Sequence, residues 1–191
     1  MEPATARKQE LSGSIRHADR ATFGALIREH QRSVFLLALR MSRGDEQLAR
    51  EVVQKTFLKA WTHRDGFRGE ASFKTWVLRI AHNLCSNELR RAWRKRELVP
   101  VSTGPEPPDL GSVEARAFDD LATAQARELL REAVHALPDR QRSVALLRIY
   151  EELSFRDVGD VCGITANNAK VSYHHAVRNI RRFLADKGVQ A

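Results

Sequence analysis

Apolar residues recur at helical spacing from residue 23 to residue 93, and turn signals divide this stretch into three predicted helices. The first covers residues 23–41. Asp45 is predicted to cap a second helix that runs to Trp61, and Ser72 to open a long third helix after a loop at residues 63–70. Their apolar stripes can share one core, which predicts a compact domain of roughly 80 residues. The stripes are Phe23, Leu26, Ile27, Val34, Leu37, Ala38 and Met41, then Leu48, Val52, Val53, Phe57, Ala60 and Trp61, then Phe73, Trp76, Val77, Ile80, Ala81 and Leu84.

The helical pattern lapses after residue 96, where prolines and glycines stand among acidic residues. We interpret residues 97–122 as a flexible acidic linker. Helical periodicity returns near residue 129, and Pro138 predicts the start of a helix that runs to about Tyr150.

A helix-turn-helix pattern follows. Ser154 and Asp157 form a predicted capping box that opens a short helix, Gly163 can end that helix, and Thr165 can cap the next. Other small helical bundles contain similar corners. We therefore predict an all-α chain with a tail at residues 1–17 and two small helical domains at residues 18–96 and 123–191, the second containing the helix-turn-helix.

The formal net charge of +8 favours a polyanionic partner, although many basic proteins bind no nucleic acid. Cys85 and Cys162 lie far apart, which excludes a disulfide framework or a four-cysteine zinc site and fits a reducing cytosol. No apolar run approaches the roughly 20 residues that span a bilayer, so we expect no direct membrane insertion.

Catalytic and metal-binding patterns are weak. We find no Ser/His/Asp arrangement, glycine-rich phosphate loop or paired catalytic carboxylates, so no catalytic residue and no enzyme activity is expected. His82 and Cys85 lie three apart on a predicted helix without a recognisable third ligand. His174 and His175 are adjacent and point about 100° apart, which is poor geometry for sharing one ion. We therefore expect no metal and no cofactor.

The last predicted helix has an apolar side and a polar side. The polar side combines amides and cations that can contact base edges and phosphates with one small apolar group. The alternative is a face that is simply solvated, for which an exposed valine is an unusual choice. The polar set is Asn167, Asn168, Lys170, Val171, His174, His175 and Arg178, and the apolar set is Ala169, Tyr173, Ala176, Val177, Ile180, Phe183 and Leu184.

The third helix carries a second basic track. Arg79, Asn83, Ser86 and Arg90 share one stripe, and further basic residues follow to residue 96. Such a track suits a phosphate backbone, and nearby aromatic rings could stack on or shelter an unpaired base. The alternative is that the rings are core and the charges are solvated. The aromatic candidates are Phe67, Phe73 and Trp76.

Residues 45–61 and 67–83 resemble the extracytoplasmic-function (ECF) group of bacterial sigma factors. The resemblance continues through Leu137-Pro138, Leu146-Leu147-Arg148 and residues 153–158, so it covers most of the chain in the family's order. It implies sigma region 2 at the N-terminal side, region 4 at the C-terminal side, and a linker in place of the larger domain of housekeeping sigma factors.

The resemblance also implies roles for individual residues. Those implied to dock on the coiled-coil clamp of the largest polymerase subunit are Asp45, Glu46, Arg50, Gln54, Lys55 and Phe57. Those implied to bind the −10 element and a flipped base are Phe67, Arg68, Gly69, Phe73, Lys74, Trp76, Arg79, Asn83, Arg90, Arg91 and Arg94. Those implied to read the −35 element are Asn167, Asn168, Lys170, Val171, His174, His175 and Arg178.

Several positions depart from the family pattern. Lys55 stands where an acid is usual and alters the charge of the clamp contact, and Asn87 stands where an Asp is common. Residues 167–168 replace a usual Gly-Thr and residues 174–175 a basic-aromatic pair, so the −35 sequence is not predictable. The run 167–175 also resembles the sigma factor of cobalt and nickel resistance, which would make a metal the inducing stress.

The resulting expectation is a transcription initiation factor that binds core RNA polymerase and promoter DNA and assists strand opening. The family resemblance further implies an anti-sigma factor, often the cytosolic tail of a membrane protein, and hence a cytoplasmic chain or one held at the inner membrane through that partner. The main rival is a stand-alone helix-turn-helix regulator, against which the match at residues 45–61 argues. A nucleic-acid-processing enzyme would need catalytic residues that the sequence lacks.

Overall fold

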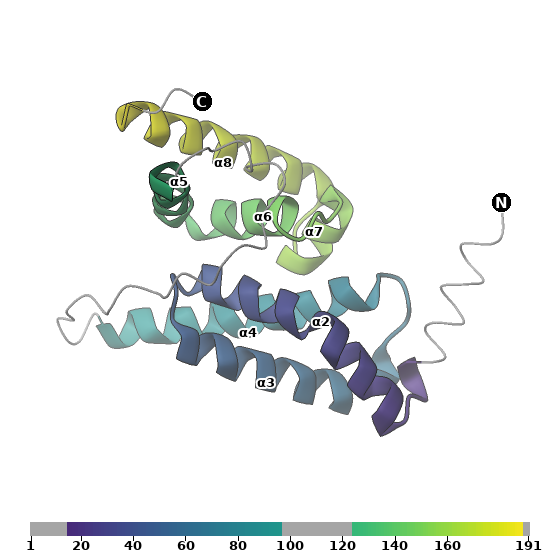
Figure 1. Ribbon diagram of the computed structural model, residues 1–191. Helices are drawn as coiled ribbons and strands as arrows, with labels where there is room; N and C mark the ends of the chain where they lie inside the picture. The colour runs from purple at the N-terminus through teal and green to yellow at the C-terminus, as the bar shows by residue number, and fades with distance from the viewer. Residues whose placement is uncertain (1–14, 97–123, 189–191) are drawn as a thin grey trace. The chain divides into compact units, whose positions relative to one another are not determined.

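The computed structural model describes residues 15–96 and 124–188, and within these ranges the regular elements are all helices (Figure 1). The chain divides into two compact units, Met1–Pro105 and Glu106–Ala191. The predicted all-α fold with two helical units is therefore confirmed. The predicted linker, residues 97–122, lies outside the described residues, as do residues 1–14 of the predicted tail.

Three long helices build the N-terminal unit: α2 (Arg20–Met41), α3 (Glu46–Thr62) and α4 (Phe73–Arg96). Each of them packs against the other two (Figure 1). A short 3-10 helix, η1 (Arg64–Gly66), lies inside the segment that we predicted to be a loop. Each predicted apolar stripe contributes buried residues to the core, although several of its members remain half-buried, among them Leu26, Ile27, Leu48, Val53, Trp61, Trp76, Ile80 and Leu84. Several buried residues were missed by the apolar pattern: Ile15, Ala18, Ala49, Thr56, Leu78 and Cys85.

Side-chain caps fix where these helices begin. The Asp45 carboxylate accepts a hydrogen bond from the Leu48 backbone N–H at 2.9 Å, and the Ser72 hydroxyl accepts one from Thr75 N–H at 3.0 Å. Each cap satisfies a backbone donor that has no partner within its own helix. Both predicted caps are confirmed. Because the caps fix the residue at which α3 and α4 begin, they also fix which side chains of each helix are exposed.

The C-terminal unit contains α5 (Ala124–Ala136), α6 (Asp139–Ile149), α7 (Phe155–Cys162) and α8 (Ala166–Asp186). Helix α8 packs against the other three (Figure 1). The connection between α5 and α6 is held by Arg142, whose side chain is only 6% exposed. Its guanidinium pairs with Asp139 at 2.6 Å and donates to the carbonyl of His135 at 3.4 Å. A buried charge is thereby kept fully engaged, as burial requires.

The corner between α7 and α8 is a helix-turn-helix, as predicted. Ser154 accepts from the Asp157 backbone N–H at 3.1 Å, and Thr165 accepts from that of Asn168 at 3.2 Å. Gly163 ends α7 in the left-handed region at φ 67°, a conformation that is costly for most other residues. Gly159 is buried where the two helices meet, and a Cβ built on it would lie 2.6 Å from the Ile164 carbonyl oxygen.

Gly159→Ala is therefore expected to destabilise the C-terminal unit by about 1–3 kcal/mol, because the added methyl overlaps backbone that cannot move aside. Amide hydrogen exchange in α6 to α8 measures this, since every tryptophan of the sequence lies in the N-terminal unit. Gly66→Ala is the control, because a Cβ there meets nothing within 4 Å. Unchanged exchange in Gly159→Ala would show that the corner is not tightly packed.

Candidate nucleic-acid and protein interfaces

An aromatic cluster joins all three helices of the N-terminal unit. The Phe23 ring lies edge-on to Trp61 and Phe73, with centroids 5.0 and 6.0 Å apart. Phe67 contacts Phe73 at 6.3 Å and Trp76 at 5.1 Å. Edge-to-face aromatic contacts of this kind stabilise beyond the area that they bury.

The three aromatic residues that are predicted to lie near a flipped base differ in how deeply they are buried. Phe67 and Phe73 are only 4% and 6% exposed, so neither ring is accessible to a base in this structure. The alternative that we left open, that Phe73 belongs to the core, agrees with this position. Trp76 is half-buried and is the one of the three with an appreciable exposed surface. A base contact of Trp76 stays a prediction, whereas the buried rings of Phe67 and Phe73 support the loop from the core.

The loop at residues 67–72 begins within this cluster, at Phe67. Its predicted DNA contact Arg68 is exposed, and Gly69 adopts a left-handed φ of 70°, which lets the chain turn sharply. The carbonyl of Phe67 accepts a hydrogen bond from Arg16 Nε at 2.8 Å. Arg16 belongs to a helical turn at residues 15–17 that we had assigned to the tail. The structure therefore packs this end of the predicted tail against the loop.

The basic stripe of α4 is presented to solvent. Arg79, Asn83, Arg90, Arg91 and Arg94 are all exposed, and Ser86 and Lys74 are half-buried. Arg90 donates to the side-chain oxygen of Asn87 at 2.6 Å, which holds its guanidinium along the helix. Such exposed guanidinium groups can pair with phosphates.

His82, which shares α4 with this stripe, is mostly buried. Burial lowers its pKa below the usual 6.5, so the imidazole is neutral at neutral pH and adds no charge to the stripe. In the described ranges, no group of three or more His, Cys, Asp or Glu residues is arranged to hold a metal ion.

Most of the predicted polymerase-binding residues are exposed, on α3 or at its N-cap Asp45. Asp45, Arg50, Gln54 and Lys55 are exposed and Glu46 is half-buried. Glu46 forms an ion pair with Arg50 one turn later.

Phe57, which we had placed both in the core and on the docking face, is only 6% exposed and belongs to the core. The apolar side chain that α3 does expose is its neighbour Leu58, at 65%. Consecutive helical residues differ by about 100°, so both cannot occupy the same face. The ring of Phe57 is therefore not accessible for docking in this structure, and polymerase contact by this part of α3 stays a prediction. A stricter reading of the helical phase could have identified Leu58 as the exposed apolar side chain.

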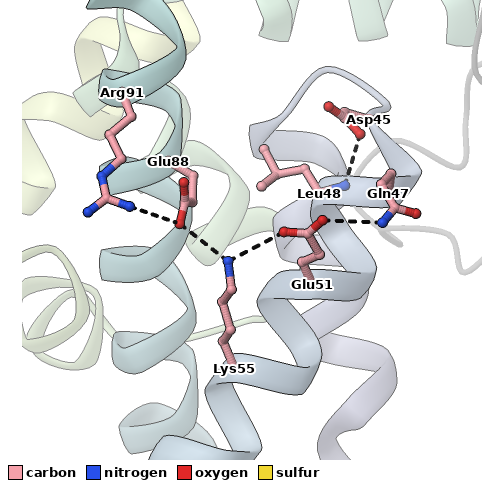
Figure 2. A network of polar contacts seen from close by, with 7 residues as sticks. All are labelled: Asp45, Gln47, Leu48, Glu51, Lys55, Glu88 and Arg91. Carbon is pink, nitrogen blue, oxygen red and sulfur yellow. Dashed lines mark hydrogen bonds and ion pairs between the residues drawn. The ribbon is translucent and has the colours of Figure 1, made fainter.

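Lys55 connects α3 to α4 (Figure 2). Its Nζ lies 3.4 Å from a carboxylate oxygen of Glu51 and 3.4 Å from one of Glu88. Gln47 donates to Glu51 at 3.2 Å, and Arg91 lies 3.8 Å from Glu88. The unusual positive charge at position 55 is thus offset within the unit. A groove beside this network is lined by Asp45, Gln47, Leu48, Glu51, Glu88, Arg91, Ala92 and Arg94.

The same contacts shift the ionisation of the partners. Hydrogen bonds to Glu51 and Glu88 raise the pKa of Lys55, and hydrogen bonds from Gln47 and Lys55 lower the pKa of Glu51. The raised pKa means that the contribution of Lys55 is lost as pH rises through it. The lowered pKa means that the contribution of Glu51 is lost as pH falls through it. Between these limits, including neutral pH, Lys55 and Glu51 are both charged.

The polar face of α8 is exposed along its whole length. Asn167, Asn168, Lys170, His174 and Arg178 are exposed, and so is His175, whose Nδ1 lies 2.7 Å from an Arg178 nitrogen. Val171 is 46% exposed in the middle of this face. The opposite side packs into the unit, where Tyr173 meets Phe155 with ring centroids 5.7 Å apart. The predicted division of α8 into a core side and a free side is confirmed, while DNA contact stays a prediction.

No helix in the described part of the chain combines the length and the apolar composition needed to cross a bilayer.

Comparison with known sequences identifies both units. Residues 26–95 match the family Sigma-70 region 2, and residues 127–180 match the family Sigma-70, region 4. The ECF RNA polymerase sigma factor SigL of Mycobacterium tuberculosis is 32% identical over 173 residues, covering 90% of this chain and 94% of its own. The RNA polymerase sigma-H factor of Pseudomonas aeruginosa is 30% identical over 169 residues, covering 80% of this chain and 81% of its own.

Solved structures show the same fold. The sigma factor RpoE from Bartonella quintana, in complex with the anti-sigma factor NepR, matches with a TM-score of 0.67 at 22% identity, over 85% of this chain and 96% of that one. CnrH, in complex with the cytosolic domain of CnrY, matches with a TM-score of 0.65 at 21% identity, over 94% of this chain and 97% of that one.

Replacing Lys55 with Glu is expected to destabilise the N-terminal unit. Lys55 now lies between the carboxylates of Glu51 and Glu88, and the substitution would bring a third carboxylate to the same place. Thermal unfolding followed by tryptophan fluorescence measures this unit selectively. The loss of melting temperature should shrink as salt is added, since ions screen exposed charges. The control is Lys59→Glu, the same charge change on the exposed surface of α3. Equal effects of both substitutions would show that the bridge to Glu88 contributes nothing.

Proposed function

The chain belongs to the extracytoplasmic-function group of the sigma-70 family, whose members direct RNA polymerase to promoters, and on that premise we propose how its surfaces divide this work. The helices α2 to α4 act as region 2 and the helices α5 to α8 as region 4. The observation that carries the proposal is that each unit presents an exposed basic helical face, on α4 and on α8. Sigma factors are initiation factors, and we assign no catalytic residue to this one.

Polymerase binding is assigned to the exposed face of α3. Arg50 and Gln54 supply polar contacts, and Leu58 supplies an apolar contact, which is the kind of side chain that interfaces bury at their centre. Lys55 is already engaged by Glu51 and Glu88. Its proposed role is therefore to hold this face to α4 as well as to touch the polymerase.

Recognition of the −10 element is assigned to α4 and the loop before it. Arg79, Arg90, Arg91 and Arg94 follow the phosphates, and Arg68, Gly69, Lys74, Trp76 and Asn83 surround an unstacked base. Extracting a base costs a few kcal/mol, which contacts to the phosphates and to the flipped base can offset. Strand opening then follows from capture of that base, without a catalytic step by the chain itself.

Recognition of the −35 element is assigned to the exposed face of α8. Asn167 and Asn168 can bond base edges, and Lys170 and Arg178 can bond bases or phosphates. Val171 can meet the methyl group of a thymine. Because two short elements are contacted by one polymerase-bound chain, two weak contacts combine into one selective contact.

An anti-sigma factor is proposed as the regulatory partner. The similar structures were solved with the anti-sigma factor NepR and with the cytosolic domain of CnrY. The apolar side chains Leu58 and Val171, exposed in the free chain, suit coverage by such a partner. We place the chain in the cytoplasm, with membrane attachment only through this partner. A metal as the inducing stress stays a proposal from the sequence.

The double substitution Arg79→Glu and Arg90→Glu tests the promoter assignment. With core polymerase, and a promoter selected from randomised DNA by the wild-type holoenzyme, run-off transcription is expected to fall by on the order of a hundredfold, because two phosphate contacts become repulsive. Arg28→Glu with Arg32→Glu makes the same charge change on the exposed surface of α2 and serves as control. Undiminished initiation by the α4 variant would reject the assignment. Tight promoter binding by the free chain would favour the stand-alone regulator instead.

Leu58→Ala and Phe57→Ala distinguish the proposed docking residue from the core residue beside it. Leu58→Ala is expected to weaken core polymerase binding by roughly tenfold with little change in stability, as for a central interface residue. Phe57→Ala is expected to lower the free energy of unfolding by about 3–5 kcal/mol through the cavity that it leaves. Fluorescence anisotropy with core polymerase and tryptophan-detected melting give the two readouts. If Leu58→Ala left polymerase affinity unchanged, α3 would need another apolar contact.

A further inference from the structure

We propose that the turn at residues 15–18 braces the loop that receives the flipped base, and that Arg16 is a positioning residue for strand opening. This inference rests on the proposed function of the loop at residues 67–72. It assigns a task to a segment whose sequence shows no motif and which we had assigned, up to residue 17, to a tail.

The turn is part of the folded unit. Ile15 is 2% exposed and Ala18 is 7% exposed, so both side chains lie in the core. The Ala18 backbone N–H donates to the Ile15 carbonyl at 3.3 Å, which closes the turn. Asp19 then caps α2 by accepting from Thr22 N–H at 2.8 Å. These contacts fix the backbone on both sides of Arg16, so its side chain extends from a rigid segment of backbone.

Arg16 holds the point at which the loop begins. Its Nε donates to the Phe67 carbonyl at 2.8 Å, across 51 positions of sequence. The other groups of Phe67 are also engaged, since its N–H donates to the Arg64 carbonyl at 3.0 Å and its ring is buried in the aromatic cluster. Arg64 is itself fixed over the Trp61 ring at 4.1 Å. The loop therefore starts at a residue, Phe67, whose N–H, side chain and carbonyl are each held in place.

The far end of the loop is held separately. Ser72 caps α4 and also shares a hydrogen bond of 2.8 Å with the Thr75 hydroxyl. Between the two anchors, Gly69 makes a sharp turn at a positive φ. The loop is therefore shaped before any base arrives. Without Arg16, the Phe67 carbonyl would lose the hydrogen bond from Nε, and part of the loop would have to be ordered when the base binds.

Arg16 could instead act through its charge on a phosphate, and the side-chain chemistry separates the two roles. The amide nitrogen of glutamine lies the same number of bonds from Cα as the Nε of arginine. Arg16→Gln can therefore keep the hydrogen bond to the Phe67 carbonyl without the charge. Arg16→Lys keeps the charge but has no nitrogen at that position of the side chain.

The test uses the full chain with core polymerase on the selected promoter, carrying 2-aminopurine in the −10 element to report base extrusion. Arg16→Ala is expected to reduce the open complex by about three- to tenfold, the range for one lost hydrogen bond. Arg16→Gln should restore most of the signal and Arg16→Lys should not. Arg20→Ala, which removes an exposed charge at the start of α2, should match the wild type.

Polymerase affinity and the melting temperature of each variant are measured in parallel. Positioning predicts that Arg16→Ala opens DNA poorly while polymerase affinity stays within about twofold of the wild type, well inside the effect of one hydrogen bond. The inference is overturned if Arg16→Ala opens DNA normally, if lysine rescues and glutamine does not, or if polymerase affinity falls in parallel with opening. Failure of the wild-type chain to open any promoter would instead count against the proposed function itself.

Discussion

The N-terminal unit depends on one packing constraint, the aromatic cluster to which α2, α3, α4 and the loop between α3 and α4 each contribute a ring. Phe23, Trp61, Phe67 and Phe73 come from four different segments, and their mutual contacts leave little freedom in how those segments meet. The place of the loop follows from this packing. The position of a polar surface is thus set by aromatic rings that pack in the core or at its edge.

The surfaces assigned to polymerase and to the −10 element lie on helices that share this core. Lys55 adds a polar tie between them, reaching from α3 to Glu88 of α4, and Glu88 lies near Arg91 at the edge of the basic stripe. The two surfaces therefore belong to one rigid body. Fixing α3 on a partner also fixes the direction in which the α4 arginines point, which lowers the entropy still to be lost when DNA binds.

Local features of the fold were predictable from the sequence, and long-range contacts were not. The caps at Asp45 and Ser72 and the left-handed Gly163 follow from residue types that serve specific backbone conformations, so short patterns reveal them. The hydrogen bond from Arg16 and the bridge from Lys55 join residues 51 and 33 positions apart and leave no local pattern. The family resemblance gave roles to residues, yet only atomic burial could separate the partly exposed ring of Trp76 from the buried rings of Phe67 and Phe73.

The construction of the α7–α8 corner has a consequence for evolution. Its geometry is set by Gly159, Gly163 and the buried side of α8, where Ala169, Ala176 and Ile180 pack. Exposed side chains on the free side of α8, such as those of Asn167, Lys170 and Val171, lie outside this buried packing. Substitutions there can accumulate with little penalty to folding, so a duplicated copy of such a chain could drift to a different set of genes while keeping its architecture intact.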